Sequence, residues 1–251
     1  MPSCASCPLF QLESDAADCI HVNRPGGIGL TREGLRLIDL PEEARVLEVG
    51  CGTGATLNYL SEQNLRAVGL DLSMEMLQRD PASGLSRVQA DNRSIPLESA
   101  SQQAVLIECA LSLSREVDET LREFNRVLPP GGKLVVSDIF VRQVTDPARL
   151  QVLSASRCLG GAMEESTIRE KVAKAGFTLK QWQDETPLFK EWLVRIIFKM
   201  GSLDALYQSL FSCPDEAAPS LISLGTEIKL GYYLLVAEKN GSRSPVQTNR
   251  R

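Results

Sequence analysis

Between residues 45 and 139 the chain alternates short apolar runs with longer amphipathic segments. The apolar runs predict strands at 45–49, 66–70, 86–90, 103–108 and 132–139. The segments between them predict helices at 54–63, from Ser73 onward, and at 117–127. Because strands alternate with helices, we expect an α/β protein built on a parallel sheet that is covered on both faces.

The pattern continues on both sides of this region. Thr31 is a plausible N-cap of a helix that reaches Ile38, and Glu164–Ala175 reads as a helix ended by Gly176. A strand is expected at 177–182, and a last strand, 232–238, is expected to insert antiparallel at the sheet edge. Apolar residues at steps of three and four predict an amphipathic helix in between. These residues are Phe189, Trp192, Ile196, Met200, Leu203, Tyr207 and Leu210.

The predicted fold is therefore a Rossmann-like, doubly wound, seven-stranded and mostly parallel sheet, with a helical insertion that covers a substrate pocket. We divide the chain of 251 residues into five parts. The first two parts are a thiol-bearing arm (1–30) and a core whose sheet is expected to bind a cofactor (31–145). The insertion with the sixth strand (146–230), the last strand (231–239) and a polar, disordered tail (240–251) follow.

Composition narrows the possible partners. The formal net charge is -5 and no cluster of Lys or Arg is present, which argues against nucleic acid and anionic membranes as partners. No segment is apolar enough to span a bilayer, and the N-terminus lacks a secretory pattern. We expect a cytoplasmic protein that acts on a small molecule and whose seven cysteines are reduced thiols. The oligomeric state stays open.

A glycine turn follows the first core strand. Glu48 is followed by Gly50, Gly52 and Gly54, and residues without a Cβ let the backbone approach a ligand closely. Asp71 closes the next strand at the distance where a nucleotide-binding unit places its ribose-binding acid. An ordinary tight turn is the alternative. The alternate-glycine spacing favours S-adenosylmethionine (SAM) over a dinucleotide, whose fingerprint leaves two residues before the last glycine.

These residues resemble the class I SAM-dependent methyltransferases, whose first motif is an acid followed by alternating glycines. The segment 124–134, with its Pro-Pro-Gly-Gly turn, resembles the helix, turn and fifth strand of that class. The resemblance covers residues 45–139 and implies SAM as the cofactor. It implies a set of cofactor-binding residues: Glu48, Gly50, Cys51, Gly52, Asp71, Leu72, Met76, Asp91, Asn92 and Cys109.

Each cofactor role has an alternative. Asp91 is expected to accept a hydrogen bond from the adenine amine, with Leu72 and Met76 against the ring, but it could instead cap a loop. Cys51 is expected to be a small buried residue, and Cys109 to pack beside the cofactor. No acid/base pair is required if the methyl acceptor is soft, because the sulfonium methyl is already a strong electrophile.

The cysteines point to a particular acceptor. Cys109 after the fourth strand and Cys158 in a Cys-x-x-Gly-Ala turn resemble the arsenite methyltransferases. In that family the turn cysteine and another about 50 residues later bind trivalent arsenic, and here Cys213 follows Cys158 by 55 residues. Soft thiolates suit such an acceptor. The family's Tyr-Gly-Cys-Gly segment is absent, since Arg24-Pro-Gly-Gly stands before the first motif.

Several readings remain open. A third thiol would come from the arm, where Cys4, Cys7, Cys19 and His21 could also form a zinc set, a mobile thiol arm or a plain terminus; no metal site is assigned. Cys158 and Cys213 are the candidate catalytic residues, although they could simply pack. The alternatives to a metalloid acceptor are methyl transfer to a carbon or oxygen atom of an organic metabolite, and a non-catalytic SAM- or metal-binding redox accessory protein.

Overall fold

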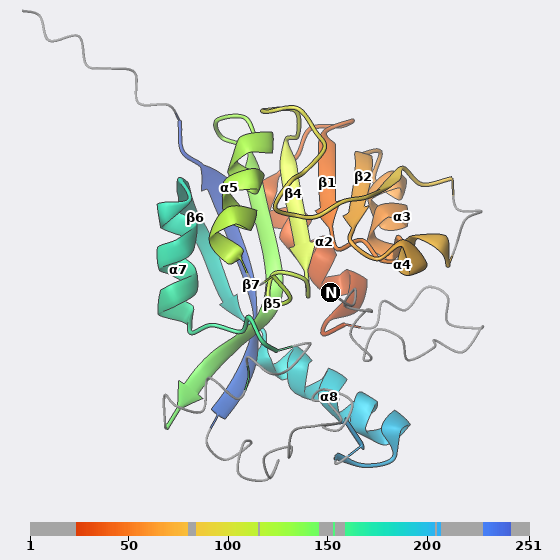
Figure 1. Cartoon of the computed structure of the whole chain (residues 1–251), viewed down its shortest axis with the longest axis vertical. Helices are drawn as coiled ribbons and strands as arrows, with labels where there is room; N and C mark the ends of the chain where they lie inside the picture. Colours follow the sequence, from red (N-terminus) through yellow and green to blue (C-terminus); the bar gives the residue numbers. More distant parts are fainter. Residues whose placement is uncertain are drawn as a thin grey trace, which may run out of the picture.

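A computed structural model describes residues 24–79, 84–114, 116–145, 153, 159–203, 205–206 and 228–241. This part of the chain contains one seven-stranded sheet with the order β3-β2-β1-β4-β5-β7-β6 (Figure 1). The strands are β1 (Arg45–Val49), β2 (Arg66–Asp71), β3 (Arg87–Gln89), β4 (Ala104–Glu108), β5 (Lys133–Val144), β6 (Phe177–Asp184) and β7 (Ile228–Lys239). Strands β1 to β4 lie where their apolar runs predicted them, and β5 begins as predicted but extends beyond 139 to Val144.

Strands β1 to β5 are parallel, and β7 pairs antiparallel with both β5 and β6. The Rossmann-like α/β fold is therefore confirmed. The expected position of the last strand is wrong, because β6 occupies the edge and β7 lies between β5 and β6. Burial explains this order: β7 is buried from Gly231 to Ala237, whereas β6 alternates with exposed residues and suits an edge.

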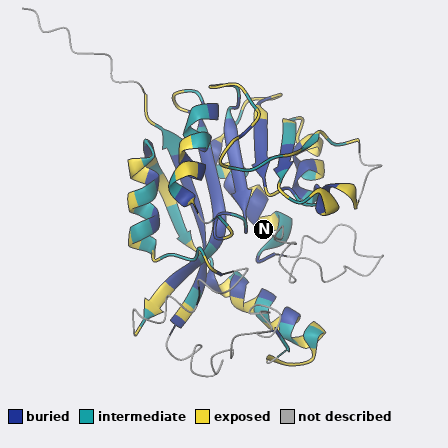
Figure 2. Ribbon diagram, viewed as in Figure 1, coloured by how far each residue is buried: buried dark blue, intermediate teal, exposed yellow. Residues whose placement is uncertain are grey.

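Helices cover both faces of the sheet, so that its strands form a buried central layer (Figure 2). Residues of α2, α3 and α8 pack on one face, and residues of α5 and α7 pack on the other. The helices of the described part are α2 (Gly27–Ile38), α3 (Ala55–Glu62), α4 (Met74–Gln78), α5 (Val117–Val127), α7 (Glu165–Lys174) and α8 (Thr186–Met200).

The ends of the helices test the predicted capping residues. Ser73 caps α4 as expected, since its hydroxyl accepts a hydrogen bond from the Met76 backbone N–H at 3.3 Å. The N-cap assigned to Thr31 is wrong. Helix α2 begins at Gly27, after Gly26 in the left-handed region (φ 73°), and Thr31 is a buried residue within the helix. Its hydroxyl serves a tertiary contact instead.

Helix α8 is shorter than its apolar stripe predicted. Phe189, Trp192 and Ile196 are buried as expected, but the helix ends at Met200, and Gly201 follows in the left-handed region (φ 83°). Beyond it, Leu203 is 44% exposed. Tyr207 and Leu210 lie outside the described residues, as do residues 1–23 of the predicted arm, most of 146–158 and 207–227 of the insertion, and residues 242–251 of the tail.

Candidate functional site

The glycine turn between β1 and α3 is fixed by the end of the neighbouring strand. The backbone N–H groups of Gly50 and Cys51 both donate to the Leu70 carbonyl oxygen, at 2.7 and 3.1 Å. Gly50 has a φ of 77°, and a Cβ there would lie 2.6 Å from the Cβ of Ala110. The turn therefore passes the loop after β4 at a distance that only glycine permits.

Asp71 organises the same turn from the end of β2. Its Oδ2 accepts from the Gly52 N–H and its Oδ1 from the Ser73 N–H, both at 2.8 Å. Each oxygen keeps a second acceptor site, because a carboxylate oxygen has two lone pairs. Next to it, Leu72 is 61% exposed, whereas Met76 is buried and its Cε would lie 3.5 Å from a Cβ on Gly52.

Glu48 lies beneath the turn as a buried carboxylate. Its Oε2 finds no hydrogen-bond partner among the described residues. Burial, together with the nearby Glu108 carboxylate, raises the pKa of Glu48 well above its ordinary value, although Arg24 and the Thr56 hydroxyl act in the opposite direction. A buried acceptor without a donor favours a ligand that brings a hydrogen-bonding cation.

The sequence reasoning missed a buried ion pair on the same face. Arg24 Nη2 lies 2.7 Å from Glu108 Oε2, at the end of β4. Two hydroxyls bridge the pair: Thr31 donates to Glu108 Oε1 at 2.9 Å, and Thr56 donates to Oε2 at 3.0 Å. Glu108 closes an apolar strand, as Glu48 and Asp71 do near the ends of theirs, and that pattern was the signal available in the sequence.

Asp91 and Asn92 follow β3, and both side chains form hydrogen bonds within the protein. Asp91 Oδ1 accepts from the backbone N–H and the Nε of Arg93, each at 2.9 Å, and Oδ2 accepts from Nη2 at 2.6 Å. The Arg93 guanidinium thereby lowers the pKa of Asp91. Asn92 Oδ1 accepts from the Thr120 hydroxyl of α5 at 3.2 Å. Their roles in adenine binding stay predictions.

Comparison with known proteins identifies this arrangement. Residues 47–136, which contain the turn, Asp71 and Glu108, match the methyltransferase domain family. An arsenite methyltransferase of Aquipseudomonas alcaligenes is 27% identical over 167 residues, which are 59% of this chain and 48% of the relative. Residues 47–136 therefore form a methyltransferase domain of the class I, SAM-dependent type.

Further relatives of this chain carry names that indicate different methyl acceptors. A ubiquinone/menaquinone biosynthesis C-methyltransferase of Syntrophotalea carbinolica is 32% identical over 56% of this chain and 62% of its own length. The phosphoethanolamine N-methyltransferase 2 of Haemonchus contortus, solved with S-adenosyl-L-methionine, has the same fold, with 20% identity and a TM-score of 0.67 over 86% of this chain and 54% of that one. The chain spans about half to two thirds of these relatives.

The residues present fit SAM, the cofactor of this family. SAM supplies a methyl group on a sulfonium, attached to an amino acid and an adenosine. The unpaired Glu48 Oε2 suits the ammonium of the amino acid, and Gly50 leaves the space that a Cβ would fill. The second acceptor sites of Asp71 suit the ribose hydroxyls. Leu72 offers the exposed apolar surface that an adenine ring covers.

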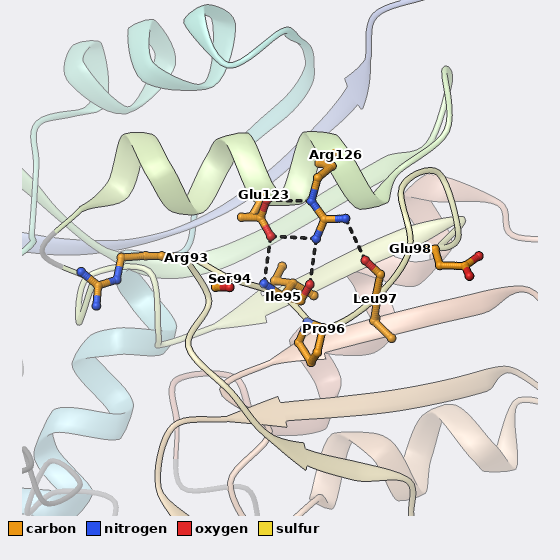
Figure 3. A pocket seen from close by; sticks show the side chains of 8 residues that line it. All are labelled: Arg93, Ser94, Ile95, Pro96, Leu97, Glu98, Glu123 and Arg126. Carbon is orange, nitrogen blue, oxygen red and sulfur yellow. Dashed lines mark hydrogen bonds and ion pairs between the residues drawn. The ribbon is translucent and has the colours of Figure 1, made fainter.

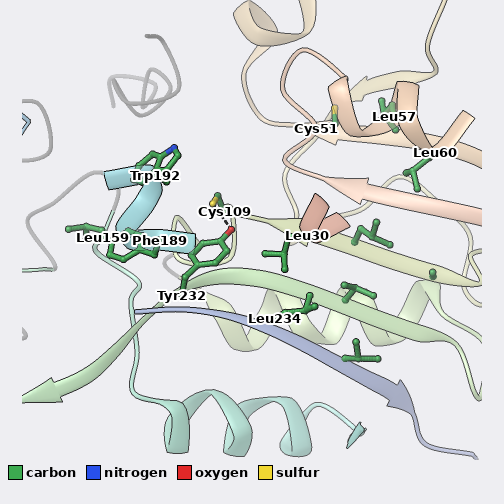
Figure 4. Packing of buried hydrophobic residues seen from close by; sticks show 14 of the residues in the cluster. Leu30, Cys51, Leu57, Leu60, Cys109, Leu159, Phe189, Trp192, Tyr232 and Leu234 are labelled. Carbon is green, nitrogen blue, oxygen red and sulfur yellow. Dashed lines mark hydrogen bonds between the residues drawn. The ribbon is translucent and has the colours of Figure 1, made fainter. Parts of the chain in front are cut away.

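The two cysteines among the described residues are buried. Cys51 packs over β2, where a Cβ on Gly69 would lie 2.6 Å from its Sγ. Cys109 adopts a left-handed φ of 53°, and its Sγ lies 2.9 Å from the Tyr232 hydroxyl (Figure 4). Burial raises the pKa of both thiols, so both stay protonated at neutral pH. Cofactor contact by either cysteine stays a prediction.

An apolar wall stands beside Cys109 at the carboxyl ends of the strands. The rings of Phe189 and Tyr232 are nearly parallel, with centroids 6.5 Å apart, and Trp192 stacks on Phe189 at 6.0 Å. Leu159 is buried in the same cluster (Figure 4). The residue before it, Cys158, lies outside the described residues, and so does Cys213.

The loop after β4 joins this wall to the cofactor turn. Asp138 fixes it, because its carboxylate accepts from the Ser112 N–H at 2.8 Å and from the Ser112 hydroxyl at 2.7 Å. The Gly161 N–H donates to the Ser112 carbonyl oxygen at 2.9 Å, and a Cβ on Gly161 would lie 2.4 Å from that oxygen. The turn that follows Cys158 is therefore in close backbone contact with the loop that follows β4.

A shallow depression between α5 and the segment after β3 has a different character (Figure 3). Arg126 donates to the carbonyl oxygens of Ile95 and Leu97 at 2.8 and 2.7 Å, and Glu123 accepts from the Ile95 N–H at 2.8 Å. Arg126 and Glu123 also pair with each other. These groups satisfy one another's hydrogen-bonding capacity, so they brace the segment and are not free to bind a ligand.

The helices in the described part of the chain do not include one with the length and apolar composition of a membrane span.

Proposed function

We propose that the chain transfers a methyl group from SAM to a soft acceptor, such as trivalent arsenic or a related metalloid, held by the thiolates of Cys158 and Cys213. The observation that carries the proposal is the contact of Gly161 with Ser112. It ties the Cys-x-x-Gly turn to the loop after β4, and this loop lies against the cofactor turn through Ala110 and Gly50.

Chain geometry limits how far Cys158 can lie from that contact. Three residues span at most about 11 Å when fully extended, and Cys158 precedes Gly161 by three residues. Polarisable thiolates bind soft centres, and the acceptor then needs only to be held in line with the methyl group. The 27% identity to an arsenite methyltransferase supports the same reading.

A second candidate is methyl transfer to a carbon or oxygen atom of a small organic metabolite. The stacked rings of Phe189, Trp192 and Tyr232 favour it, because an apolar wall suits an organic acceptor better than an ion. The quinone-pathway C-methyltransferase is a relative with such an acceptor by its name. For either acceptor we propose a cytoplasmic protein with reduced thiols and a small-molecule substrate.

The experiment follows methyl transfer from labelled SAM to arsenite in the presence of a reducing thiol. We expect activity that Cys158→Ser and Cys213→Ser each lower at least a hundredfold, while the affinity for S-adenosylhomocysteine (SAH) stays within twofold. Ser166→Ala, which changes an exposed hydroxyl on α7, is the control and retains activity.

Other outcomes separate the candidates. Full arsenite methylation by both cysteine variants contradicts thiolate binding of the acceptor. Transfer to an organic acceptor that ignores both substitutions supports the second candidate. SAH binding together with one equivalent of zinc, and no turnover on any acceptor, would identify a non-catalytic accessory protein.

A further inference from the structure

Two buried atoms on the α2 side of the sheet remain without hydrogen-bond partners in the described part of the chain. One is a donor, Arg24 Nε, and the other is an acceptor, Glu48 Oε2. Arg24 is 6% exposed and Glu48 is 4% exposed, so water satisfies neither atom freely. Because buried donors and acceptors are nearly always paired in proteins, the two atoms together indicate a ligand that carries an acceptor and a donor.

The remaining nitrogens of Arg24 are engaged and fix the plane of its guanidinium. Nη1 donates to the Thr56 hydroxyl at 3.2 Å, and Nη2 donates to the Thr31 hydroxyl and pairs with Glu108. Both threonine hydroxyls in turn donate hydrogen bonds to the Glu108 carboxylate. Arg24, Glu108 and the two hydroxyls therefore form a closed ring of hydrogen bonds, from which only Nε is left over.

The sheet register brings Glu48 to the same site. Glu48 pairs with Leu106, and side chains two residues apart on a strand point to the same face, so Glu108 and Glu48 share the face that α2 covers. With both carboxylates and Arg24 ionised, the cluster carries one excess negative charge. The methionine portion of SAM carries an ammonium, a carboxylate and a sulfonium, and therefore one excess positive charge.

We propose that Arg24 binds the carboxylate of the cofactor's methionine portion through Nε, and that it thereby selects ligands that keep this carboxylate. Glu48 receives the ammonium, which is bonded to the same α-carbon as that carboxylate. Arg24 precedes α2 and lies outside the matched domain at 47–136, so a residue from before the domain completes the cofactor site. The inference does not depend on the acceptor.

The test compares two ligands by calorimetry. SAH retains the amino acid, whereas 5′-methylthioadenosine keeps the adenosine and the sulfur but lacks both the ammonium and the carboxylate. In Arg24→Gln we expect the SAH affinity to fall at least tenfold and the methylthioadenosine affinity to change less than twofold. The matched control is Arg36→Gln, an exposed arginine of α2 paired with Glu33, which leaves both affinities within twofold.

Two results overturn the proposal. If both ligands weaken equally, Arg24 only seats α2 on the sheet; if neither weakens, Arg24 does not reach the ligand. Arg24→Gln leaves the buried Glu108 carboxylate without its counter-charge and can therefore destabilise the fold. Thermal melting shows whether the variant is folded. Should it unfold, Glu108→Gln decides, since it keeps the guanidinium and removes its carboxylate partner. We then expect the preference for SAH over methylthioadenosine to rise at least threefold; an unchanged or lower preference contradicts the proposal.

Discussion

Gly161→Ala adds one methyl group at the contact between the turn after Cys158 and the loop after β4. The new Cβ would lie 2.4 Å from the Ser112 carbonyl oxygen, 3.0 Å from the Ser112 carbonyl carbon and 3.1 Å from the Ser114 oxygen. These are backbone atoms, and the two hydrogen bonds that Ser112 donates to the Asp138 carboxylate hold Ser112 in place. The loop therefore cannot move aside, and the turn that carries Gly161 must shift.

The size of that shift follows from the contact distances. Ordinary van der Waals contact begins at 3.4 Å, so relief from 2.4 Å requires a displacement of 1.0 Å. A misplacement of about 1 Å in a reacting group costs roughly a hundredfold in rate, or about 2.7 kcal/mol. We expect kcat/KM for methyl transfer to fall by about that factor, while SAH binds as tightly as before, because the displaced turn is on the acceptor side.

The assay measures initial rates with whichever acceptor the unmodified chain methylates, and SAH affinity by calorimetry. Gly29→Ala is the control: a Cβ there meets nothing within 4 Å, and the change stabilises α2 by about 0.5–1 kcal/mol without loss of rate. A rate within threefold of the original would show that the turn does not position the acceptor. A parallel loss of SAH affinity would place Gly161 on the cofactor side instead.

Three further predictions concern the cofactor side. Gly50→Ala strains a residue at φ 77° and clashes with Ala110, so SAH affinity measured by calorimetry should fall at least tenfold. A change under twofold would show that the cofactor does not lie against the backbone at Gly50. Burial and the Glu108 carboxylate raise the pKa of Glu48, and Glu48 must lose its proton before it binds an ammonium, so SAH affinity should rise with pH below that raised pKa. In Glu48→Gln the affinity should no longer depend on pH in this range. An equally steep pH profile in the variant would show that another group titrates. Thr31→Val removes a donor to Glu108 and should lower the free energy of unfolding in urea by about 1–3 kcal/mol, whereas an unchanged value would show that the hydroxyl is dispensable.

The sequence predicted the strands of the core because buried parallel strands are continuous apolar runs, as in β1 and β4. It predicted the two long strands less well. The expected ranges 132–139 and 232–238 became Lys133–Val144 and Ile228–Lys239, since the ends of β5 and β7 pair with each other as far as Val144 and Ile228. That pairing joins residues far apart in the chain, so no local pattern reveals it.

The same distinction holds within the site. Glu48, Gly50 and Asp71 belong to local patterns in which a strand ends at a turn, so the sequence predicts where they lie, while their roles toward the cofactor stay predictions. The sequence does not predict the ion pair of Arg24 and Glu108, because the two side chains meet only when β4 lies beside β1 and α2 covers that face. Thr31 shows the same limit: it has the residue type of an N-cap, but its hydroxyl serves Glu108 across 77 residues.

The charge of this cluster bears on which form of the cofactor the site prefers. Glu48 and Glu108 lie buried on one face with Arg24 as the ion-pair partner of Glu108, and the raised pKa of Glu48 records the cost of keeping the second carboxylate ionised. A ligand with a sulfonium and an ammonium offsets that cost more fully than the demethylated product, whose sulfur is neutral. We therefore expect the excess of acid to favour the methyl donor over its product. Arg24, which precedes α2, and Thr31, which lies within α2, both bind the Glu108 carboxylate. The packing of that helix on the sheet and the charge state of the site therefore depend on each other.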